Sequence, residues 1–217
     1  VVFADVDPET GLMGSRELDE AVARARQDGL VPRAVFAVHL AGQCSDPESL
    51  SIAAAAHGLS VVEDASHSLG TTYGSGDTLC RVGACAHSKM TTFSFHPVKT
   101  IAMGEGGAVT TNDEQISERL RRLRNHGVTR DAPQFESPTE ALDADAQVNP
   151  WYYEMQELGF NYRASDIHCA LGLSQLRKLE FRSERRAALV ARYCEGMAEL
   201  SPVIRPLSQV PDCSPCW

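Results

Sequence analysis

The stretch TTFSFHPVKTIAMGEGGAV, residues 91–109, decides how the middle of this chain folds. Residues 91–96 are rich in Thr and Phe, which is typical of a β-strand. The glycines within residues 104–107 let the chain turn sharply into a further strand and let its backbone approach a ligand, because glycine has no Cβ. Lys99 lies between the strand and the turn. The stretch therefore predicts a strand followed by a lysine-bearing loop.

Short apolar runs before this stretch predict three more strands, at residues 1–6, 34–40 and 59–65. Segments with helical signals separate them. Ser15 suits a helix cap, and residues 46–58 begin with Asp-Pro and end with glycine, as helices often do. Strands that alternate with helices indicate βαβ units. We therefore expect an α/β fold with a mostly parallel sheet.

Beyond the glycines the pattern becomes helical. A helix is expected from about Glu114 to His126, followed by a polar, proline-containing loop over residues 129–150. Residues 164–200 carry apolar side chains at helical spacing, so we expect one long helix, with a kink allowed, that leads out of the sheet domain. The predicted domain boundary lies between residues 165 and 166.

The composition argues against several classes of function. The chain of 217 residues has a formal net charge of −9, whereas nucleic-acid binding depends on clustered lysine and arginine. A membrane span needs roughly 18 consecutive apolar residues, and the sequence has no such run. The seven cysteines are odd in number and scattered, which favours reduced thiols and a cytoplasmic location. Cys213 and Cys216 lack a second pair or a flanking histidine, so we expect no metal site.

Three polar side chains end or follow predicted strands, namely Asp64, Ser94 and Lys99. In open parallel sheets, ligands bind beyond the carboxyl ends of the strands. Taken singly, the aspartate could cap a loop or helix, the serine could simply end its strand, and the lysine could be a surface charge. Their combination with the glycine run favours a ligand site.

These residue types match what pyridoxal phosphate requires. A lysine amine forms an imine with the cofactor, and an anion keeps its pyridine nitrogen protonated. Hydroxyl or amide donors hold the phosphate, and a flat group packs on the ring. Lys99 and Asp64 can fill the first two roles. Ser94 and His67 can fill the other two, with a packing histidine as the alternative reading of His67.

Three motifs carry a family resemblance. The runs EDASHSLG (63–70), FSFHPVKTI (93–101) and EGG (105–107) resemble, in this order, motifs of the DegT-type nucleotide-sugar aminotransferases. Those enzymes depend on pyridoxal phosphate and have fold type I of the pyridoxal-phosphate-dependent enzymes. The resemblance continues through RLRNHG (122–127) and PWYYEMQELGFNYRASDIHCALGLSQL (150–176), so it covers nearly the whole chain.

The resemblance implies a three-layer α/β sandwich with a mostly parallel sheet. Residues 1–165 would be part of the cofactor-binding large domain, without its N-terminus, and residues 166–217 would be a long helix and the start of a small C-terminal domain. The family's N-terminal Gly-Ser/Thr-Ala helix start, which cradles the phosphate, has no counterpart here. We therefore expect a fragment that is weakly active or inactive by itself.

The resemblance also implies a role for each site residue. Lys99 would form the Schiff base and move the substrate proton, and Asp64 would pair with the pyridinium nitrogen. His67 would lie against the ring, and Ser94 would bind the phosphate. Asn161 falls where the family supplies a phosphate contact from the other subunit, which implies a homodimer. Asn161 could instead cap the helix that follows it.

Within the family, SHSLG (66–70), FSFHPVKTI and PWYYEMQELGFNYR (150–163) are most similar to the aminotransferases of pseudaminic acid biosynthesis. Their substrates would be small molecules, a UDP-linked 4-keto-6-deoxy-N-acetyl hexosamine aminated at C4 and glutamate as the amino donor. Types that make 4-amino-arabinose or perosamine remain open, as does a non-catalytic fragment that only binds pyridoxal phosphate.

Two other enzyme classes fit less well. Sugar 3-dehydratases that use pyridoxal phosphate on the same fold carry histidine where this chain has Lys99. A Rossmann enzyme that binds NAD would need a GxGxxG motif after its first strand, and none follows residues 1–6.

Overall fold

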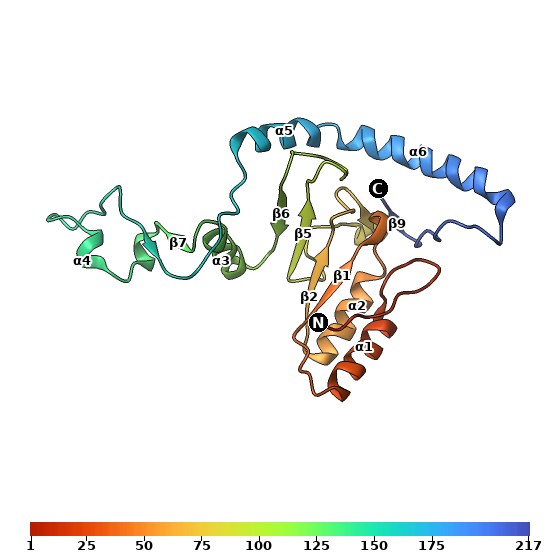
Figure 1. Ribbon diagram of the computed structural model, residues 1–217, viewed down its shortest axis with the longest axis horizontal. Coiled ribbons are helices and arrows are strands. Elements are labelled where there is room, and N and C mark those ends of the chain that lie inside the picture. The colour runs from red at the N-terminus through yellow and green to blue at the C-terminus, as the bar shows by residue number, and fades with distance from the viewer. The chain divides into compact units, whose positions relative to one another are not determined.

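The computed structural model describes residues 1–137 and 139–217. They form two compact units (Figure 1). The first unit comprises residues 1–112 and 166–217, and the second comprises residues 113–165. The described residues include no helix long and apolar enough to cross a lipid bilayer.

Four strands form the main sheet of the first unit. In sheet order they are β1 (Ala34–Val38), β2 (Ser60–Asp64), β5 (Met90–Ser94) and β6 (Gly107–Thr110). Strands β1, β2 and β5 run parallel, and β6 runs antiparallel to β5 (Figure 1). The predicted α/β fold with a mostly parallel sheet is therefore confirmed, and three of the four predicted strands become β1, β2 and β5.

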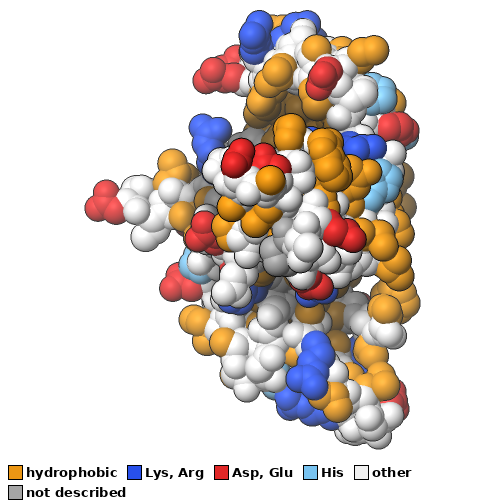
Figure 2. Space-filling view, turned by 90° about the vertical axis from the view of Figure 1, so that its left-hand side faces the viewer, with side chains coloured by type: hydrophobic (Ala, Val, Ile, Leu, Met, Phe, Trp, Pro, Cys, Tyr) orange, Lys and Arg blue, Asp and Glu red, His pale blue; other side chains and the backbone are white. Residues whose placement is uncertain are grey.

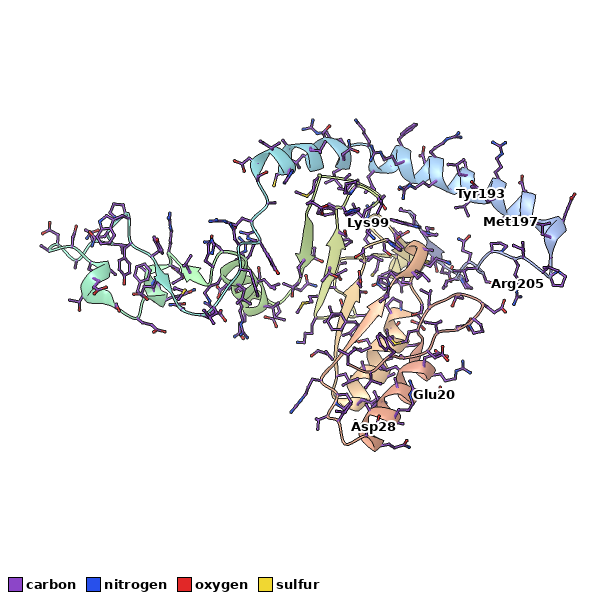
Figure 3. The ribbon with its side chains drawn as sticks, in the orientation of Figure 1. Glu20, Asp28, Lys99, Tyr193, Met197 and Arg205 are labelled. Atoms are coloured by element: carbon purple, nitrogen blue, oxygen red, sulfur yellow. The ribbon has the colours of Figure 1, made fainter. Side chains whose placement is uncertain are left out.

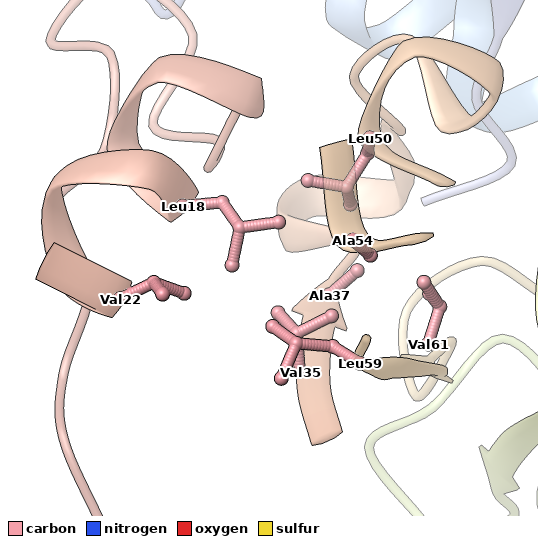
Figure 4. Packing of buried hydrophobic residues seen from close by; sticks show 8 residues of the cluster. All are labelled: Leu18, Val22, Val35, Ala37, Leu50, Ala54, Leu59 and Val61. Atoms are coloured by element: carbon pink, nitrogen blue, oxygen red, sulfur yellow. The ribbon is translucent and has the colours of Figure 1, made fainter. Parts of the chain in front are cut away.

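Helices α1 (Ser15–Gln27) and α2 (Pro47–His57) pack against β1 and β2. Their apolar side chains point toward those of the sheet and bury them from water, which favours folding. The buried cluster consists of Leu18, Val22, Val35, Ala37, Leu50, Ala54, Leu59 and Val61 (Figure 4). This core fixes the two strands and hence the position of the polar residues at their carboxyl ends.

The helix ends follow local capping chemistry. Asp46 caps α2 by accepting hydrogen bonds from two amides of its first turn, and Gly58 ends the helix in the left-handed conformation, with φ of 74°. Both were predicted. The predicted cap of α1 is wrong by one residue, because Gly14 is the cap and Ser15 is the first helical residue. The Glu17 carboxylate, three residues after the cap, accepts the Gly14 amide at 2.9 Å and so satisfies the amide of the cap residue itself.

The strand predicted at residues 1–6 does not form. All six are described, and five of them, all but Asp5, line an apolar groove of about 740 Å³ together with residues of α1 and β1. The Phe3 carbonyl accepts a hydrogen bond from Arg24 of α1 at 2.8 Å. A strand requires a partner along its length, and here the segment is attached to a helix side chain rather than to the edge of β1.

Two helices of the first unit, α5 (Asp166–Leu176) and α6 (Leu179–Met197), lie beyond the carboxyl ends of β2 and β5 (Figure 1). The long helix expected over residues 164–200 is thus divided at Arg177 and Lys178. A second, antiparallel sheet contains β4 (Cys80–Arg81), β3 (Thr72–Tyr73) and β9 (Cys213–Ser214) in that order. Short 3₁₀ helices complete this unit: η1 (Leu40–Gly42), η2 (Gly76–Thr78) and η4 (Ala198–Leu200).

The second unit contains α3 (Glu114–Arg124), β7 (Val128–Thr129), η3 (Ala132–Gln134), α4 (Pro138–Ala141) and β8 (Glu154–Met155). Helix α3 begins at the predicted residue and ends two residues before the predicted His126. The loop expected over residues 129–150 includes η3 and α4. Strand β7 pairs antiparallel with β8, and Arg122 lies 2.8 Å from Glu157 in an ion pair.

Several large apolar side chains of the second unit are more than half exposed. They are Trp151, Tyr153, Met155, Leu158, Phe160 and Tyr162. Phe160 and Tyr162 stack with their ring centroids 4.9 Å apart. Figure 2 shows hydrophobic side chains standing among acidic and basic ones on one face of the molecule.

Candidate functional site

Two neighbouring parallel strands bring polar residues to one edge of the sheet. Asp64 is the last residue of β2, and Ser94 is the last residue of β5. Asp64 is paired in register with Thr92, so the ends of the two strands lie side by side. The loop that carries Lys99 leaves β5 directly after Ser94. The structure thus gathers three of the predicted site residues at the carboxyl edge of the sheet.

The Asp64 carboxylate is held in a fixed orientation. Its Oδ1 accepts hydrogen bonds from the Ser66 amide at 3.0 Å and from the Ser66 hydroxyl at 2.6 Å. Its backbone carbonyl accepts the amide of His39, which follows β1, at 3.0 Å. Hydrogen bonds to both the main chain and one carboxylate oxygen restrain this aspartate, so its carboxylate keeps one orientation.

The Lys99 loop is closed by backbone hydrogen bonds. The Phe95 amide donates to Gly106 at 2.8 Å, and the Met103 amide donates to the Phe95 carbonyl at 3.0 Å. The Lys99 amide donates to His96 at 2.9 Å, which forms a tight turn around the lysine. These bonds hold the base of the loop and leave the Lys99 side chain half-buried between the sheet and α6 (Figure 3).

The glycine run behind the loop serves the sheet. A Cβ on Gly107 would lie 2.6 Å from the Phe93 carbonyl oxygen, which is too close for any other residue type. Gly107 pairs with Ser94 as β6 begins. This glycine therefore permits a close approach to strand β5.

A planar arrangement surrounds His67. The indole of Trp217 stacks on the His67 ring, with centroids 3.9 Å apart and planes inclined by 20°. The Lys99 Nζ lies 5.4 Å from the Trp217 ring centroid, and the Arg186 guanidinium of α6 lies at the same distance. Gly42 admits this packing, because a Cβ there would lie 2.8 Å from the Cβ of Trp217. The Trp217 ring thus contacts the cations of Lys99 and Arg186 as well as the His67 ring.

The electrostatics of His67 show which groups are near it. Burial lowers the pKa of His67, the Lys99 charge lowers it further, and the Asp64 carboxylate acts in the opposite sense. A histidine with a lowered pKa is neutral at about pH 7, so its ring packs on another ring without carrying a charge there. His67, Lys99 and Asp64 therefore belong to one site.

Ser94 is half-buried, and its hydroxyl oxygen accepts a hydrogen bond from the His96 amide at 3.4 Å. A hydroxyl that accepts one bond still has its own proton to donate. Ser94 can therefore donate to a phosphate oxygen from the end of its strand.

Asn161 lies in the second unit and is exposed. It forms an isolated antiparallel bridge with Asn125, and its Oδ1 accepts Arg163 Nε at 3.0 Å. Helix α5 begins at Asp166, so Asn161 is too far along the chain to be its cap. The alternative role considered for this asparagine is thereby removed.

A buried carboxylate network lies directly beneath the site. Glu63 is 4% exposed and precedes Asp64 on β2. Its Oε2 accepts hydrogen bonds from the buried Thr91 hydroxyl and from the Ser88 hydroxyl, the latter at 3.0 Å, and its Oε1 lies 3.4 Å from His39 Nε2. Burial raises the pKa of Glu63, but His39 and the two hydroxyls outweigh this effect and leave the pKa lowered. Glu63 thus fixes β2 against β5 just below Asp64.

The residues around Lys99 fit pyridoxal phosphate. The Trp217 indole stands in for the ring of a ligand, because it shows that a planar aromatic group packs on His67 with the Lys99 amine over its face. Asp64 provides the carboxylate, and Ser94 provides a hydroxyl. Among the described residues, no group of three or more His, Cys, Asp and Glu side chains is arranged to hold a metal ion.

The sequence did not point to Trp217 or Arg186. Both reach the site from the part of the chain after residue 165, through contacts that no local pattern encodes. Arg182, one helical turn before Arg186, donates to the Thr100 carbonyl at 3.4 Å, so the half-buried face of α6 is basic. An apolar stripe would have been visible as a helical period, whereas arginines at this spacing resemble a solvated face.

Comparison with known proteins identifies relatives over nearly the whole length. The family model described as the DegT/DnrJ/EryC1/StrS aminotransferase family matches residues 1–212. The spore coat polysaccharide biosynthesis protein SpsC of Bacillus subtilis is 33% identical over 205 residues, which are 94% of this chain and 47% of that protein. The chain spans about half the length of the curated relatives it matches.

Two solved structures share the fold. A DegT/DnrJ/EryC1/StrS aminotransferase from Brucella abortus superimposes with a TM-score of 0.78 and 27% identity, over 100% of this chain and 51% of the other. PseC of Helicobacter pylori, an aminotransferase involved in the biosynthesis of pseudoaminic acid, superimposes with a TM-score of 0.72 and 27% identity. That match covers 95% of this chain and 49% of PseC.

Proposed function

This chain belongs to the DegT/DnrJ/EryC1/StrS aminotransferase family, and on that premise we propose that it is part of an enzyme that aminates a keto nucleotide-sugar with pyridoxal phosphate. One observation carries the proposal. The half-buried Lys99 faces an aromatic ring stacked on His67, at the strand ends that carry Asp64 and Ser94. An amine, an anion, a hydroxyl and a flat ring meet there, as pyridoxal phosphate chemistry requires.

Each residue of the proposed site has one task. Pyridoxal phosphate, when bound, withdraws electrons from the carbon that carries the amino group. Lys99 Nζ would hold the cofactor and would move a proton to or from the substrate carbon. Asp64, oriented by Ser66, holds the proton on the pyridine nitrogen.

The remaining residues position the ring and the phosphate. The neutral ring of His67 packs on the cofactor face, and this requires that the Trp217 indole leave that face. Ser94 donates its hydroxyl proton to the phosphate, because its oxygen already accepts the His96 amide. Arg186 remains available to screen the negative charge of a substrate near the same face.

For the substrate, we propose a UDP-linked 4-keto-6-deoxy-N-acetyl hexosamine aminated at C4, with glutamate as the amino donor. The runs around His67 and Lys99 support this choice, and the likeness to a protein of pseudoaminic acid biosynthesis agrees with it. The 4-amino-arabinose and perosamine types stay as alternatives. Lys99 itself argues against a 3-dehydratase, whose members carry histidine there.

The proposal extends to assembly. We propose a homodimer in which Asn161 contacts the phosphate bound in the partner subunit. The exposed aromatic residues near Asn161 in sequence support this, because Trp151, Phe160 and Tyr162 offer an apolar surface of the kind that subunits bury. We also propose that the cofactor-binding domain ends at residue 165 and that a small domain starts at residue 166. The same proposal includes a cytoplasmic location.

Visible absorption spectroscopy tests the proposed cofactor site. The chain mixed with pyridoxal phosphate should show the band of a lysine-bound imine, and Lys99→Ala should lack it. Lys89→Ala is a matched control, because Lys89 is an exposed lysine at the opposite end of β5. An equal band in the Lys99→Ala variant, or none in the parent, would contradict the assignment. Mass spectrometry of products from UDP-, GDP- and dTDP-linked keto-sugars with glutamate then tests the substrate.

A further inference from the structure

Two of the seven cysteines are in direct contact. All seven are free thiols, and the sulfur atoms of Cys44 and Cys213 lie 3.7 Å apart. Both residues are buried, at 1% and 3% exposure. Cys44 follows η1 after strand β1, and Cys213 begins β9, so the pair joins parts of the chain that are far apart in sequence. A disulfide needs sulfur atoms about 2 Å apart, so the two side chains must rotate toward each other to form one.

Hydrogen bonds hold the segment that carries Cys213 beside Cys44. Gln43 donates its side-chain amide to the Ser208 carbonyl at 3.2 Å and accepts the Val210 amide at 2.8 Å. Cys213 pairs with Tyr73 in the β3–β9 ladder. The segment of residues 208–217 is thus tied beside Cys44 by several bonds. Its last residue is Trp217, whose indole covers His67.

A cavity gives small molecules a way to the pair. It has a volume of about 390 Å³, and its lining includes Cys44, Cys213, Tyr73 and His87. A hydroperoxide is smaller than this space. The two thiols are therefore buried from bulk solvent but lie in the wall of a cavity that a small oxidant can occupy.

The two thiols differ in acidity. The hydrogen bond between the two sulfur atoms lowers the pKa of Cys213, and the charge of His39 acts in the same direction against the effect of burial. The same hydrogen bond and burial raise the pKa of Cys44. Thiolates are the nucleophiles in thiol oxidation, so Cys213 is the attacking sulfur and Cys44 the resolving one.

We propose that Cys44 and Cys213 are a reversible redox pair that a hydroperoxide converts to a disulfide, which fastens residues 208–217 over the Lys99 site. The Cys213 thiolate attacks a peroxide oxygen, the O–O bond breaks, and the departing oxygen takes a proton and leaves as water. The Cys44 sulfur then attacks the sulfenic sulfur of Cys213, the S–O bond breaks, and the hydroxide takes the Cys44 proton as a second water. Two thiols and one hydrogen peroxide give one disulfide and two waters.

The disulfide has a consequence at the site, and this part of the inference goes beyond the proposed function. With the pair reduced, hydrogen bonds and packing hold the 208–217 segment in the part of the chain that the structure describes, and Trp217 can leave His67 when these contacts break. With the pair oxidised, a covalent bond four residues from Trp217 keeps the indole near His67. A planar ligand then enters more slowly. A thiol reductant restores the open form by exchange.

Peptide mapping after oxidation tests the pair directly. The reduced chain is treated with hydrogen peroxide, alkylated and digested, and the masses of cross-linked peptides are measured. A peptide joining Cys44 to Cys213, lighter by two hydrogens than the two reduced peptides and lost on treatment with dithiothreitol, is the expected result. It should be absent from Cys44→Ser and present in Cys85→Ser, because Cys85 is also buried but its sulfur contacts the hydroxyls of Thr91 and Thr110. Alkylation of Cys44 and Cys213 as free thiols in the treated, folded parent would overturn the proposal.

Tryptophan fluorescence tests the fastening without any cofactor. In a Trp151→Phe background, Trp217 is the sole tryptophan. Oxidation should reduce the quenching of its fluorescence by acrylamide several-fold, and the same treatment of a chain that also carries Cys44→Ser should leave the quenching unchanged. If the mapped disulfide forms and the quenching stays the same, the pair does not control the segment. Because neither readout involves pyridoxal phosphate, a failure here is distinct from a failure of the proposed enzyme function.

Discussion

Replacing Glu63 by alanine should destabilise the first unit, and the size of the effect can be worked out from its contacts. The substitution removes the acceptor of the Thr91 hydroxyl, which is 0% exposed and has no access to water. The Cys85 sulfur, 3.4 Å from this hydroxyl, is only a weak acceptor, so the poorly satisfied buried hydroxyl costs roughly 1–3 kcal/mol. The Ser88 hydroxyl is half-buried and can bind water instead, so its loss adds roughly 0.5 kcal/mol.

The space left behind contributes as well. Loss of the buried methylene removes about 0.8 kcal/mol of hydrophobic stabilisation. Release of a desolvated charge offsets part of the sum. We therefore expect Glu63→Ala to lower the free energy of unfolding by roughly 2–4 kcal/mol, and Glu63→Gln, which keeps one acceptor oxygen, by about 1 kcal/mol.

Urea unfolding followed by far-ultraviolet circular dichroism measures these changes as shifts of the midpoint at an unchanged slope. Glu118→Ala is a matched control, because Glu118 is exposed on α3 in the second unit. The reasoning is refuted if Glu63→Ala unfolds within about 0.5 kcal/mol of the parent, since surface substitutions have effects of that size.

Three further outcomes are expected. The pKa of Glu63 is lowered from its ordinary value of 4.5, so the stability that its charge contributes is complete above that pH and is lost as the pH falls below it. The difference in urea midpoint between the parent and Glu63→Gln should therefore become smaller at about pH 4. Leu50→Ala, at a residue 2% exposed in the core, should cost about 2–5 kcal/mol in urea unfolding, whereas Ile52→Ala on the exposed face of the same helix should cost under about 0.5 kcal/mol. Trp217→Ala uncovers His67, so the pKa of His67 measured by proton NMR titration should rise toward its ordinary value of 6.5; an unchanged pKa would show that the indole does not cause the burial.

Features set by short stretches of sequence could be predicted. Strand β2 is a run of valines ending in Glu-Asp, and the ends of α2 depend on Asp46 and Gly58, whose effects act within a few residues. The order of strand and helix then brings Asp64 and Ser94 to one sheet edge, because parallel strands share a direction. The strand and the glycine run within residues 91–109 also placed Lys99 in the loop that follows β5.

Features that depend on distant partners could not be predicted in this way. Residues 1–6 have the composition of a strand but lie against α1, since a strand forms only beside another. Trp217 reaches His67 because Gly42 leaves room and Gln43 holds residues 208–210, three contacts that have no common local pattern. The predicted cap Ser15 is instead the first residue of α1, because the helix is capped one residue earlier at Gly14, whose amide the Glu17 carboxylate accepts.

The arrangement of the strands around the Lys99 loop also affects the order in which the chain folds. Strands β5 and β6 are neighbours in sequence and pair as a hairpin, so the turn around Lys99 can form from local contacts within microseconds. Asp64 reaches that turn only after β2 has paired with β5 across a long connection, which requires a larger loss of chain entropy. The loop that carries Lys99 should therefore form before Asp64 reaches it. In refolding followed by hydrogen exchange, the amides of the β5–β6 hairpin should become protected earlier than those of the β2–β5 pairing.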